Sequence, residues 1–323
     1  MTSGIVIPHV PTSITILICT RNRSESLRKT LLAIEECEVP VSATGGVEIL
    51  VVDNGSTDDT AQVASDHITA KYTIRYLFEP VRGKSNAYNA GVNAARGEVI
   101  ISTDDDVIPS ASWLIEHIQP YTEVNVALVQ GRVILDFGEN SPPEWLGPLH
   151  RQFLAETAFG DAPICPFEGG FIGANMSFRK SAIPSENPFE PLLGPGRAGF
   201  GEEEHFAEAI MRSGFVGYYN HLASVKHVIS PERLDPKYFT DTALRMGRSL
   251  SFRLAIGEHQ DATRFNAITV TRAYVGAWRS KMRCAFTREA WYGSADHLRF
   301  LVYIGFARAN LLGFDRLRKS LED

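Results

Sequence analysis

Short apolar runs alternate with helix-forming segments through the first half of the chain, and this alternation constrains the fold more than any other feature. Residues 14–19 (ITILIC) and 47–52 (VEILVV) are rich in β-branched side chains, as expected of strands buried on both faces of a parallel sheet. Further strands are predicted at 73–78, 98–102 and 126–135, and a last one near 216–219. Strands that alternate with helices predict a doubly wound α/β sheet.

The helices between these strands are predicted from capping residues and apolar spacing. Ser24 or Ser26 is the expected N-cap of the first helix, and Ser56 or Thr57 that of the second, because a short hydroxyl side chain accepts hydrogen bonds from the first turn. Other segments with helix signals lie at 85–95, at 110–118 and from about residue 202.

Residues 137–200 are rich in Pro, Gly and aromatic side chains, which indicates loops over a site. From about Pro236 the pattern is helical to the end of the sequence. We therefore expect one domain over 1–230 and a helical C-terminal appendage over 231–323.

The most apolar late stretch, residues 298–314, is interrupted by Arg299, Arg308 and Asn310 and is shorter than the roughly 20 apolar residues of a membrane span. It predicts a packed helix, with a helix lying on a membrane surface as the alternative. The first residues lack the charged and apolar regions of a secretory signal. We therefore expect a cytoplasmic location, either free or peripheral to the inner face of the membrane.

The charge and the cysteines argue against several classes of function. Lys and Arg total 32 against 38 Asp and Glu, a formal net charge of −6, so the chain lacks the basic field that would hold nucleic acid. An anionic ligand would need local donors or a bound cation. The cysteines are far apart and form neither a zinc nor a disulfide pattern, so all four are expected to be reduced: Cys19, Cys37, Cys165 and Cys284.

Polar residues directly follow three of the predicted strands. They are 20–23 (TRNR) after the first, 53–56 (DNGS) after the second and 104–106 (DDD) after the fourth. In an open α/β sheet, ligands bind beyond the carboxyl ends of the strands, so these segments are candidates for one site at one sheet edge. For 53–56, a simple turn and helix cap is an alternative that these residue types favour by themselves.

Three adjacent aspartates, Asp104, Asp105 and Asp106, repel one another unless a cation or strong donors compensate them. If the segment is extended, Asp104 and Asp106 share one face and Asp105 faces the other way. Such a D-x-D motif suits Mg²⁺ or Mn²⁺, which take oxygen ligands and share them with a diphosphate. The alternative is an acidic loop that leads into a helix capped at Ser110.

A second acidic cluster, Glu202, Glu203 and Glu204, follows a Gly/Pro-rich loop at 192–201 (LLGPGRAGFG). It is either an acidic helix N-terminus favoured by the helix dipole, or a carboxylate that a mobile lid delivers to a pocket. The loop formally contains G-x-G-x-x-G, but no strand precedes it and Pro195 lies inside it, so a dinucleotide site is rejected.

Five segments, taken in order, resemble the large inverting glycosyltransferase family 2, whose members have the GT-A fold. They are ITILICTRNR, VEILVVDNGSTDDT, RGKSNAYNAGVNAARGEVIISTDDDVIP, GGFIGANMSFRK and GEEEHFAEAIMRSGF. The resemblance implies a Rossmann-like doubly wound mixed sheet with a C-terminal helical appendage. It also implies a direct displacement at the anomeric carbon of a nucleotide sugar, with inversion.

The resemblance assigns roles residue by residue. The donor nucleotide is contacted by Thr20, Arg21, Asp53, Lys84, Asp104 and Asp105. The sugar is lined by Gly173 and Asn175. Mn²⁺ or Mg²⁺ is held by Asp104, Asp106 and His227. His227 is expected just after the last strand, and a purely structural histidine is the alternative there. The general base is Glu203 or Glu202, because Glu203 stands where the family more often has Asp. Arg233 neutralises the leaving diphosphate, with a solvated surface arginine as the equal alternative.

The implied function is sugar transfer from a UDP-, GDP- or dTDP-sugar to a glycan or lipid-linked acceptor, in polysaccharide or glycoconjugate synthesis. A carboxylate takes the proton of the acceptor hydroxyl, and a metal neutralises the leaving diphosphate. Two other classes stay open. One is a nucleotide-sugar-binding protein without turnover. The other is a nucleotidyltransferase, which is disfavoured because residues 20–23 lack a Gly-rich triphosphate loop.

Overall fold

The protein is seen in a computed structural model that describes residues 10–256 apart from 68, 124, 140 and 158, together with 275, 278, 279, 295–312 and 314–322. The chain forms two compact units. Unit 1 takes the described residues of Met1–Asp136, Ala155–Glu190 and Glu203–Val228, and unit 2 those of Phe137–Leu154, Pro191–Glu202 and Ile229–Asp323. Each unit therefore draws on several separate segments of the sequence. The two-domain division near residue 230 stays a prediction.

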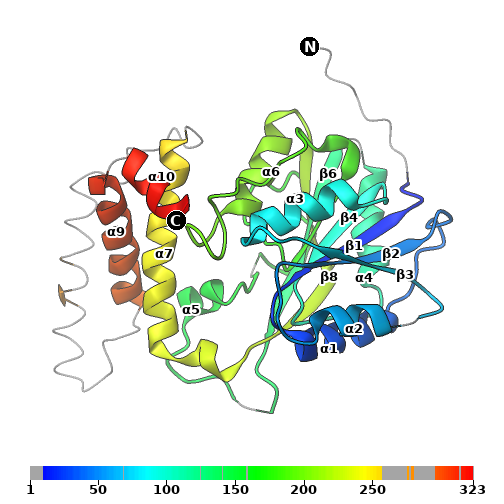
Figure 1. Ribbon diagram of the computed structural model, residues 1–323, viewed down its shortest axis with the longest axis horizontal. Helices are drawn as coiled ribbons and strands as arrows, with labels where there is room; N and C mark the ends of the chain where they lie inside the picture. Colours follow the sequence, from blue (N-terminus) through cyan, green and yellow to red (C-terminus); the bar gives the residue numbers. More distant parts are fainter. Residues whose placement is uncertain are drawn as a thin grey trace. The chain divides into compact units, whose positions relative to one another are not determined.

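Unit 1 contains the predicted alternation of strands and helices (Figure 1). Its strands are β1 (Ile14–Thr20), β2 (Val47–Asp53), β3 (Thr73–Phe78), β4 (Val99–Thr103), β5 (Val107–Pro109), β6 (Val126–Asp136), β7 (Asn175–Arg179) and β8 (Val216–Val228). Its helices are α1 (Ser24–Glu35), α2 (Thr60–Asp66), α3 (Lys84–Ala94), α4 (Trp113–Ile118) and, from Glu203 on, α6 (Glu202–Arg212), with the 3₁₀ turns η1 (Gln119–Thr122) and η2 (Lys180–Ala182). Five of the six predicted strands are confirmed to within one residue. The sixth, near 216–219, is the start of β8, which continues to Val228.

The described strands form one mixed sheet in the order β3-β2-β1-β4-β7-β6-β8-β5. Strands β1 to β4 pair in parallel, whereas β7 runs antiparallel to both β4 and β6, and β5 antiparallel to β8. This arrangement confirms the GT-A expectation of a doubly wound mixed sheet. It also places the ends of β1, β2 and β4 side by side at one edge.

Both faces of the sheet are buried, which explains the continuous apolar runs of the central strands. On one face Ile16 of β1 and Ile49 of β2 belong to the core that packs against α1, α2 and α4. On the other face Leu17 and Leu50 belong to the core that packs against α3 and helix α6 (Glu202–Arg212). Figure 1 shows these two helical layers on opposite sides of the strands. Consecutive side chains of a β-strand point to opposite faces of the sheet, so neighbours such as Ile16 and Leu17 belong to different cores.

Two expected helix caps are wrong. Helix α1 begins at Ser24 itself, and its N-cap residue is Arg23, which makes no side-chain cap. Helix α2 begins only at Thr60, where Asp58 Oδ1 accepts hydrogen bonds from the Thr60 backbone N–H (3.1 Å) and hydroxyl (2.5 Å). Ser56 instead accepts a hydrogen bond from the Asn22 N–H, so its hydroxyl joins two loops. Ser56 is thus of a residue type that is typical of helix caps, but it joins two loops instead.

Strand β7 was missed, because the whole of 137–200 was expected to be loops. This short strand (NMSFR) lies between β4 and β6 in the centre of the sheet, and all five of its residues are buried. The expected position of His227 just after the last strand is also wrong. Strand β8 extends to Val228, so His227 lies within it, opposite Val107 of β5.

Unit 2 is helical, which confirms the appendage. It contains α5 (Pro148–Phe153), the 3₁₀ turn η3 (Pro231–Leu234), α7 (Pro236–Ala255), α9 (Ala295–Leu312) and α10 (Phe314–Glu322). Leu298, Phe306 and Ala309 of α9 are buried, which supports the packed-helix alternative for this segment. Among the described residues, no helix is both long enough and apolar enough to cross a bilayer. Contact with a membrane surface stays a prediction.

The Gly/Pro-rich loop before α6 is fastened within unit 2 rather than open. Arg248 of α7 donates hydrogen bonds to the carbonyl oxygens of Arg197 and Ala198, and Ser249 Oγ accepts one from the Phe200 N–H. Leu193 and Ala198 are fully buried. The described cysteines Cys19, Cys37 and Cys165 are free thiols, and Cys284 lies outside the described residues.

Candidate active site

The three polar segments predicted from the strand ends meet at one edge of the sheet in unit 1. Thr20 at the end of β1 lies opposite Asp53 at the end of β2, and the Asn54 N–H donates to the Thr20 carbonyl oxygen (2.9 Å). The Thr20 hydroxyl in turn donates to Asp105 Oδ2 (2.5 Å), which follows β4. The parallel register of these strands therefore builds the site, as expected for an open α/β sheet.

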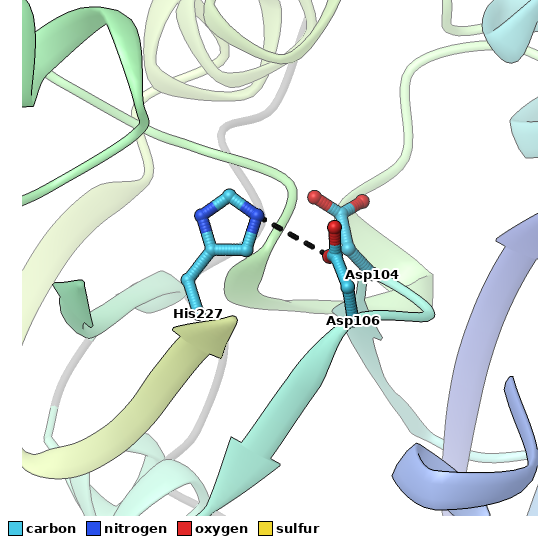
Figure 2. Close-up of side chains that lie close together, drawn as sticks. All are labelled: Asp104, Asp106 and His227. Atoms are coloured by element: carbon cyan, nitrogen blue, oxygen red, sulfur yellow. Dashed lines mark ion pairs between the residues drawn. The ribbon is translucent and has the colours of Figure 1, made fainter. Parts of the chain in front are cut away.

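The aspartates at 104–106 form a turn between β4 and β5 rather than an extended strand. Even so, one carboxylate oxygen each of Asp104 and Asp106 and one imidazole nitrogen of His227 lie within 4.8 Å of one another. Figure 2 shows both carboxylates beside the ring, with His227 Nε2 3.3 Å from Asp106 Oδ1. His227 reaches this point because β8 pairs with β5, which directly follows the aspartates.

This donor set fits a divalent metal. Two carboxylates and one imidazole suit Mn²⁺, and carboxylate oxygens suit Mg²⁺. Asp106 and His227 are only 4% and 3% exposed, while Asp104 is half-buried. The three residues are therefore the best candidates for a metal site in the described part of the chain.

The charge of the aspartates is compensated in part by two cations of the chain, Arg23 and Lys84. Lys84 was expected to contact the nucleotide, whereas neither pairing with the aspartates was predicted from the sequence. Arg23 pairs with Asp105 through Nη1 (2.9 Å) and with Asp106 through Nη2 (2.8 Å), and Lys84 Nζ lies 3.1 Å from Asp104 Oδ1. Burial raises the pKa of Asp105 to about 7, against the opposing effect of Arg23. Adjacent aspartates alone therefore do not require a metal. The case for one rests on the donor set.

Three of the expected nucleotide contacts make hydrogen bonds within the protein. Thr20 and Asp105 are buried and hydrogen-bonded to each other. Asp53 is also buried, and its carboxylate accepts hydrogen bonds from the Ser56 N–H (2.8 Å) and from the Tyr76 hydroxyl (2.8 Å). Burial and the contact with Asp53 raise the pKa of Tyr76 to about 12. Arg21, by contrast, is exposed.

Lys84 joins the aspartates to the second acidic cluster. It is the first residue of α3 and follows Gly83, whose φ of 130° lies in the region that favours glycine. Asn54 Oδ1 accepts a hydrogen bond from the Gly83 N–H (2.8 Å) and so holds the start of the helix beside β2. From there Lys84 Nζ lies 3.2 Å from Glu203 Oε1 as well as close to Asp104. Asn54 was not singled out from the sequence, although it lies in the 53–56 segment.

The two candidate bases lie in different units. Glu203 belongs to unit 1, is half-buried and contacts Lys84. Glu202 belongs to unit 2 and is 2% exposed, and its carboxylate carbon packs so closely on Gly194 that a Cβ there would lie 2.8 Å from it. Arg233, in η3, also belongs to unit 2, so its diphosphate role stays a prediction.

Gly173 and Asn175, expected to line the sugar, differ in surroundings. Gly173 lies against Glu203. The Asn175 side chain is fully buried and makes hydrogen bonds within the fold, with Trp113, His117, Arg132 and Ala223. Its contacts therefore support a structural role rather than the expected one.

The sequence model of Glycosyl transferase family 2 matches residues 15–184, more than half of the chain. The chain belongs to this family. This is a family of glycosyl transferases, and the matched residues include β2, β4, the aspartate turn and all of β1 except its first residue. The family assignment favours neither the binding protein without turnover nor the nucleotidyltransferase.

Two curated relatives are also glycosyltransferases. Glycosyltransferase AglE of Haloferax volcanii is 31% identical over 121 residues, 37% of this chain and 39% of its own length. The pre-mycofactocin glycosyltransferase of Mycobacterium tuberculosis is 26% identical over 218 residues, 66% of this chain and 42% of its own length. The chain thus spans about two fifths of the length of these relatives.

The family 2 fold is confirmed by a solved structure. The mannosyltransferase PcManGT from Pyrobaculum calidifontis, in complex with GDP-Man and Mn²⁺, superposes with a TM-score of 0.62 at 19% identity. The match covers 94% of this chain and 88% of that one. At this identity the likeness establishes the GT-A architecture.

Proposed function

We propose that this family 2 enzyme transfers a sugar from a nucleoside-diphosphate sugar to an acceptor hydroxyl, with inversion and with a divalent metal. The observation that carries the proposal is the gathering, within unit 1, of Asp104, Asp106 and His227 near Glu203, with Lys84 in contact with both acidic clusters. The GDP-Man and Mn²⁺ bound by the Pyrobaculum mannosyltransferase support a nucleotide-sugar donor and a divalent cofactor.

The donor side of the site is assigned to the loops at the sheet edge. The residues proposed to contact the nucleotide are Thr20, Arg21, Asp53, Lys84, Asp104 and Asp105. Unit 1 carries all of them, which supports donor chemistry within residues 1–230. The helical region 231–323 is proposed to serve the acceptor, a glycan or a lipid-linked molecule, and Arg233 to neutralise the diphosphate.

The proposed reaction is a single displacement. The acceptor oxygen forms a bond to the anomeric carbon while the bond from that carbon to the diphosphate oxygen breaks, and the diphosphate leaves with the electron pair. Glu203 accepts the proton of the acceptor hydroxyl. Lys84 holds the Glu203 carboxylate through its contact with Oε1. When bound to Asp104, Asp106 and His227, Mn²⁺ or Mg²⁺ supplies charge neutralisation for the diphosphate.

Titration calorimetry tests the donor site. UDP, GDP and dTDP are titrated into the wild type and into Asp106→Ala, each with and without Mn²⁺. We expect one of the nucleotides to bind more tightly with Mn²⁺, and Asp106→Ala to lose this gain. The matched control is Glu25→Ala, which removes a carboxylate with an 80% exposed side chain on α1 and should keep the gain. Equal wild-type affinity with and without the metal would overturn the metal role.

Incubation with nucleotide sugars tests turnover. With Mn²⁺ present, a glycosyltransferase of this kind should slowly release free nucleoside diphosphate even when no acceptor is supplied. Tight nucleotide binding with no release and no transfer to any acceptor would contradict the proposed reaction.

A further inference from the structure

Gly173 lies where a side chain would collide with the proposed base. A Cβ on Gly173 would stand 2.5 Å from Glu203 Oε1, 3.1 Å from its Cγ and 2.2 Å from the Tyr88 hydroxyl oxygen. Real Cβ atoms essentially never make contacts below 3.0 Å. The Gly173 backbone is not in the left-handed region, so its conformation alone does not require glycine. What requires glycine is the space that the Tyr88 hydroxyl and the Glu203 carboxylate occupy.

The Gly173 backbone is also prevented from moving away. The Ser102 hydroxyl on β4 donates to the Gly173 carbonyl oxygen (2.8 Å). Because Ser102 has one hydroxyl hydrogen, the Tyr88 hydroxyl 2.9 Å from Ser102 Oγ must be the donor of that second hydrogen bond. Next along the chain, the Thr103 hydroxyl donates to the Ala174 carbonyl oxygen (2.8 Å). Buried hydroxyls from β4 and α3 thus fix the peptide beneath the carboxylate.

Lys84 acts on the same oxygen from another element. Its Nζ lies 3.2 Å from Glu203 Oε1, the Glu203 atom nearest to the Gly173 Cβ position, and 3.1 Å from Asp104 Oδ1. Glu203 is therefore held by an ammonium from α3 and by close packing on the loop before β7. Neither contact comes from α6, the helix on which Glu203 lies.

We propose that Gly173 is a positioning residue for the reaction: its missing side chain lets the Glu203 carboxylate sit against a fixed backbone and within reach of Lys84. The resemblance had placed Gly173 among residues that line the sugar, whereas here it acts on the base. The inference rests on the proposed role of Glu203. It predicts that one added methyl group displaces the carboxylate and slows transfer without weakening nucleotide binding.

The first test compares Gly173→Ala with Gly169→Ala. Gly169 lies in the same loop, is exposed and has no atom within 4 Å of its Cβ position, so its variant controls for the change of residue type. We expect Gly173→Ala to lower kcat on the order of 10²-fold, as a misplacement of about 1 Å can. Nucleoside diphosphate affinity should stay within about twofold, and Gly169→Ala should match the wild type. A Gly173→Ala enzyme with wild-type kcat, or an equal loss in Gly169→Ala, overturns the proposal.

The second test does not depend on activity, so it distinguishes a failure of this inference from a failure of the proposed base. Melting temperatures are measured in a Tyr88→Phe background, which removes the other close neighbour of the added methyl group. Gly173→Ala is introduced there with Glu203 present and with Glu203→Ala. We expect a smaller loss of melting temperature when Glu203 is absent, because the two sites are then uncoupled. An equal loss in both backgrounds shows that Gly173 does not accommodate Glu203 and overturns the inference. If Glu203→Gln transferred sugar at the wild-type rate, Glu203 would no longer be the base. A melting-temperature coupling between positions 173 and 203 would still stand.

Discussion

Replacing Asn175 by alanine should destabilise the fold of unit 1 instead of acting on the sugar. Asn175 Oδ1 accepts hydrogen bonds from Trp113 Nε1 (2.8 Å) and His117 Nε2 (2.8 Å), and Nδ2 donates to the carbonyl oxygens of Arg132 (2.8 Å) and Ala223 (2.7 Å). At about 1 kcal/mol for each net hydrogen bond, the loss is about 4 kcal/mol. Groups left buried without partners would add to it. A typical domain has a free energy of unfolding of about 5–15 kcal/mol, so the effect is large.

Urea unfolding at pH 7 measures this loss of stability. Titration with the nucleotide sugar, at a temperature where Asn175→Ala stays folded, measures the affinity for the donor. We expect a free energy of unfolding lower by about 4 kcal/mol and a nucleotide-sugar affinity within about twofold of the wild type. A loss below about 1 kcal/mol together with a tenfold or greater loss of nucleotide-sugar affinity would refute the structural role and restore the sugar contact.

Two further predictions concern stability. Burial lowers the pKa of His117 from 6.5 to about 4, so between these pH values the unfolded state binds a proton that the folded state does not, and stability falls as pH falls through this window. The free energy of unfolding should fall by about 3 kcal/mol across this window because of His117. In urea unfolding, His117→Gln should show a flatter dependence of this free energy on pH, and an unchanged dependence contradicts the prediction. Gly247→Ala on α7 should lose about 1–3 kcal/mol despite better helix propensity, because its Cβ would lie 2.0 Å from the Val302 carbonyl oxygen of α9. A rise in melting temperature would show that the helices can separate at no cost.

The regular part of the fold was predictable because its strands are buried on both faces. Strands such as β1 and β2 are rich in β-branched residues, and their ends mark the polar loops in the sequence itself. Strand β7 gave no such signal, since it is five residues long and carries Asn175 and Ser177, whose burial depends on hydrogen bonds from α4. Partners that lie far apart in the sequence cannot be identified from local pattern.

The candidate site shows the same limit. The aspartates and Glu203 were identifiable from strand ends and family motifs. Arg23, which pairs with two of the aspartates, was not singled out, because an arginine after a strand reads equally as a surface residue. The contact of Lys84 with both Asp104 and Glu203 depends on where α3 and α6 pack, and only the structure brings these residues together.

The most direct test of the account is the transfer rate of Glu203→Gln beside that of Glu202→Gln, with a donor chosen by thermal-shift screening of UDP-, GDP- and dTDP-sugars. The account predicts that Glu203→Gln binds the nucleotide as the wild type does while kcat falls on the order of 10²–10⁴-fold, because the amide keeps the shape but cannot take a proton. Near wild-type transfer by Glu203→Gln, with Glu202→Gln inactive and its donor affinity intact, would move the base by one residue. Wild-type rates in both variants would contradict inverting transfer by a carboxylate base at this site.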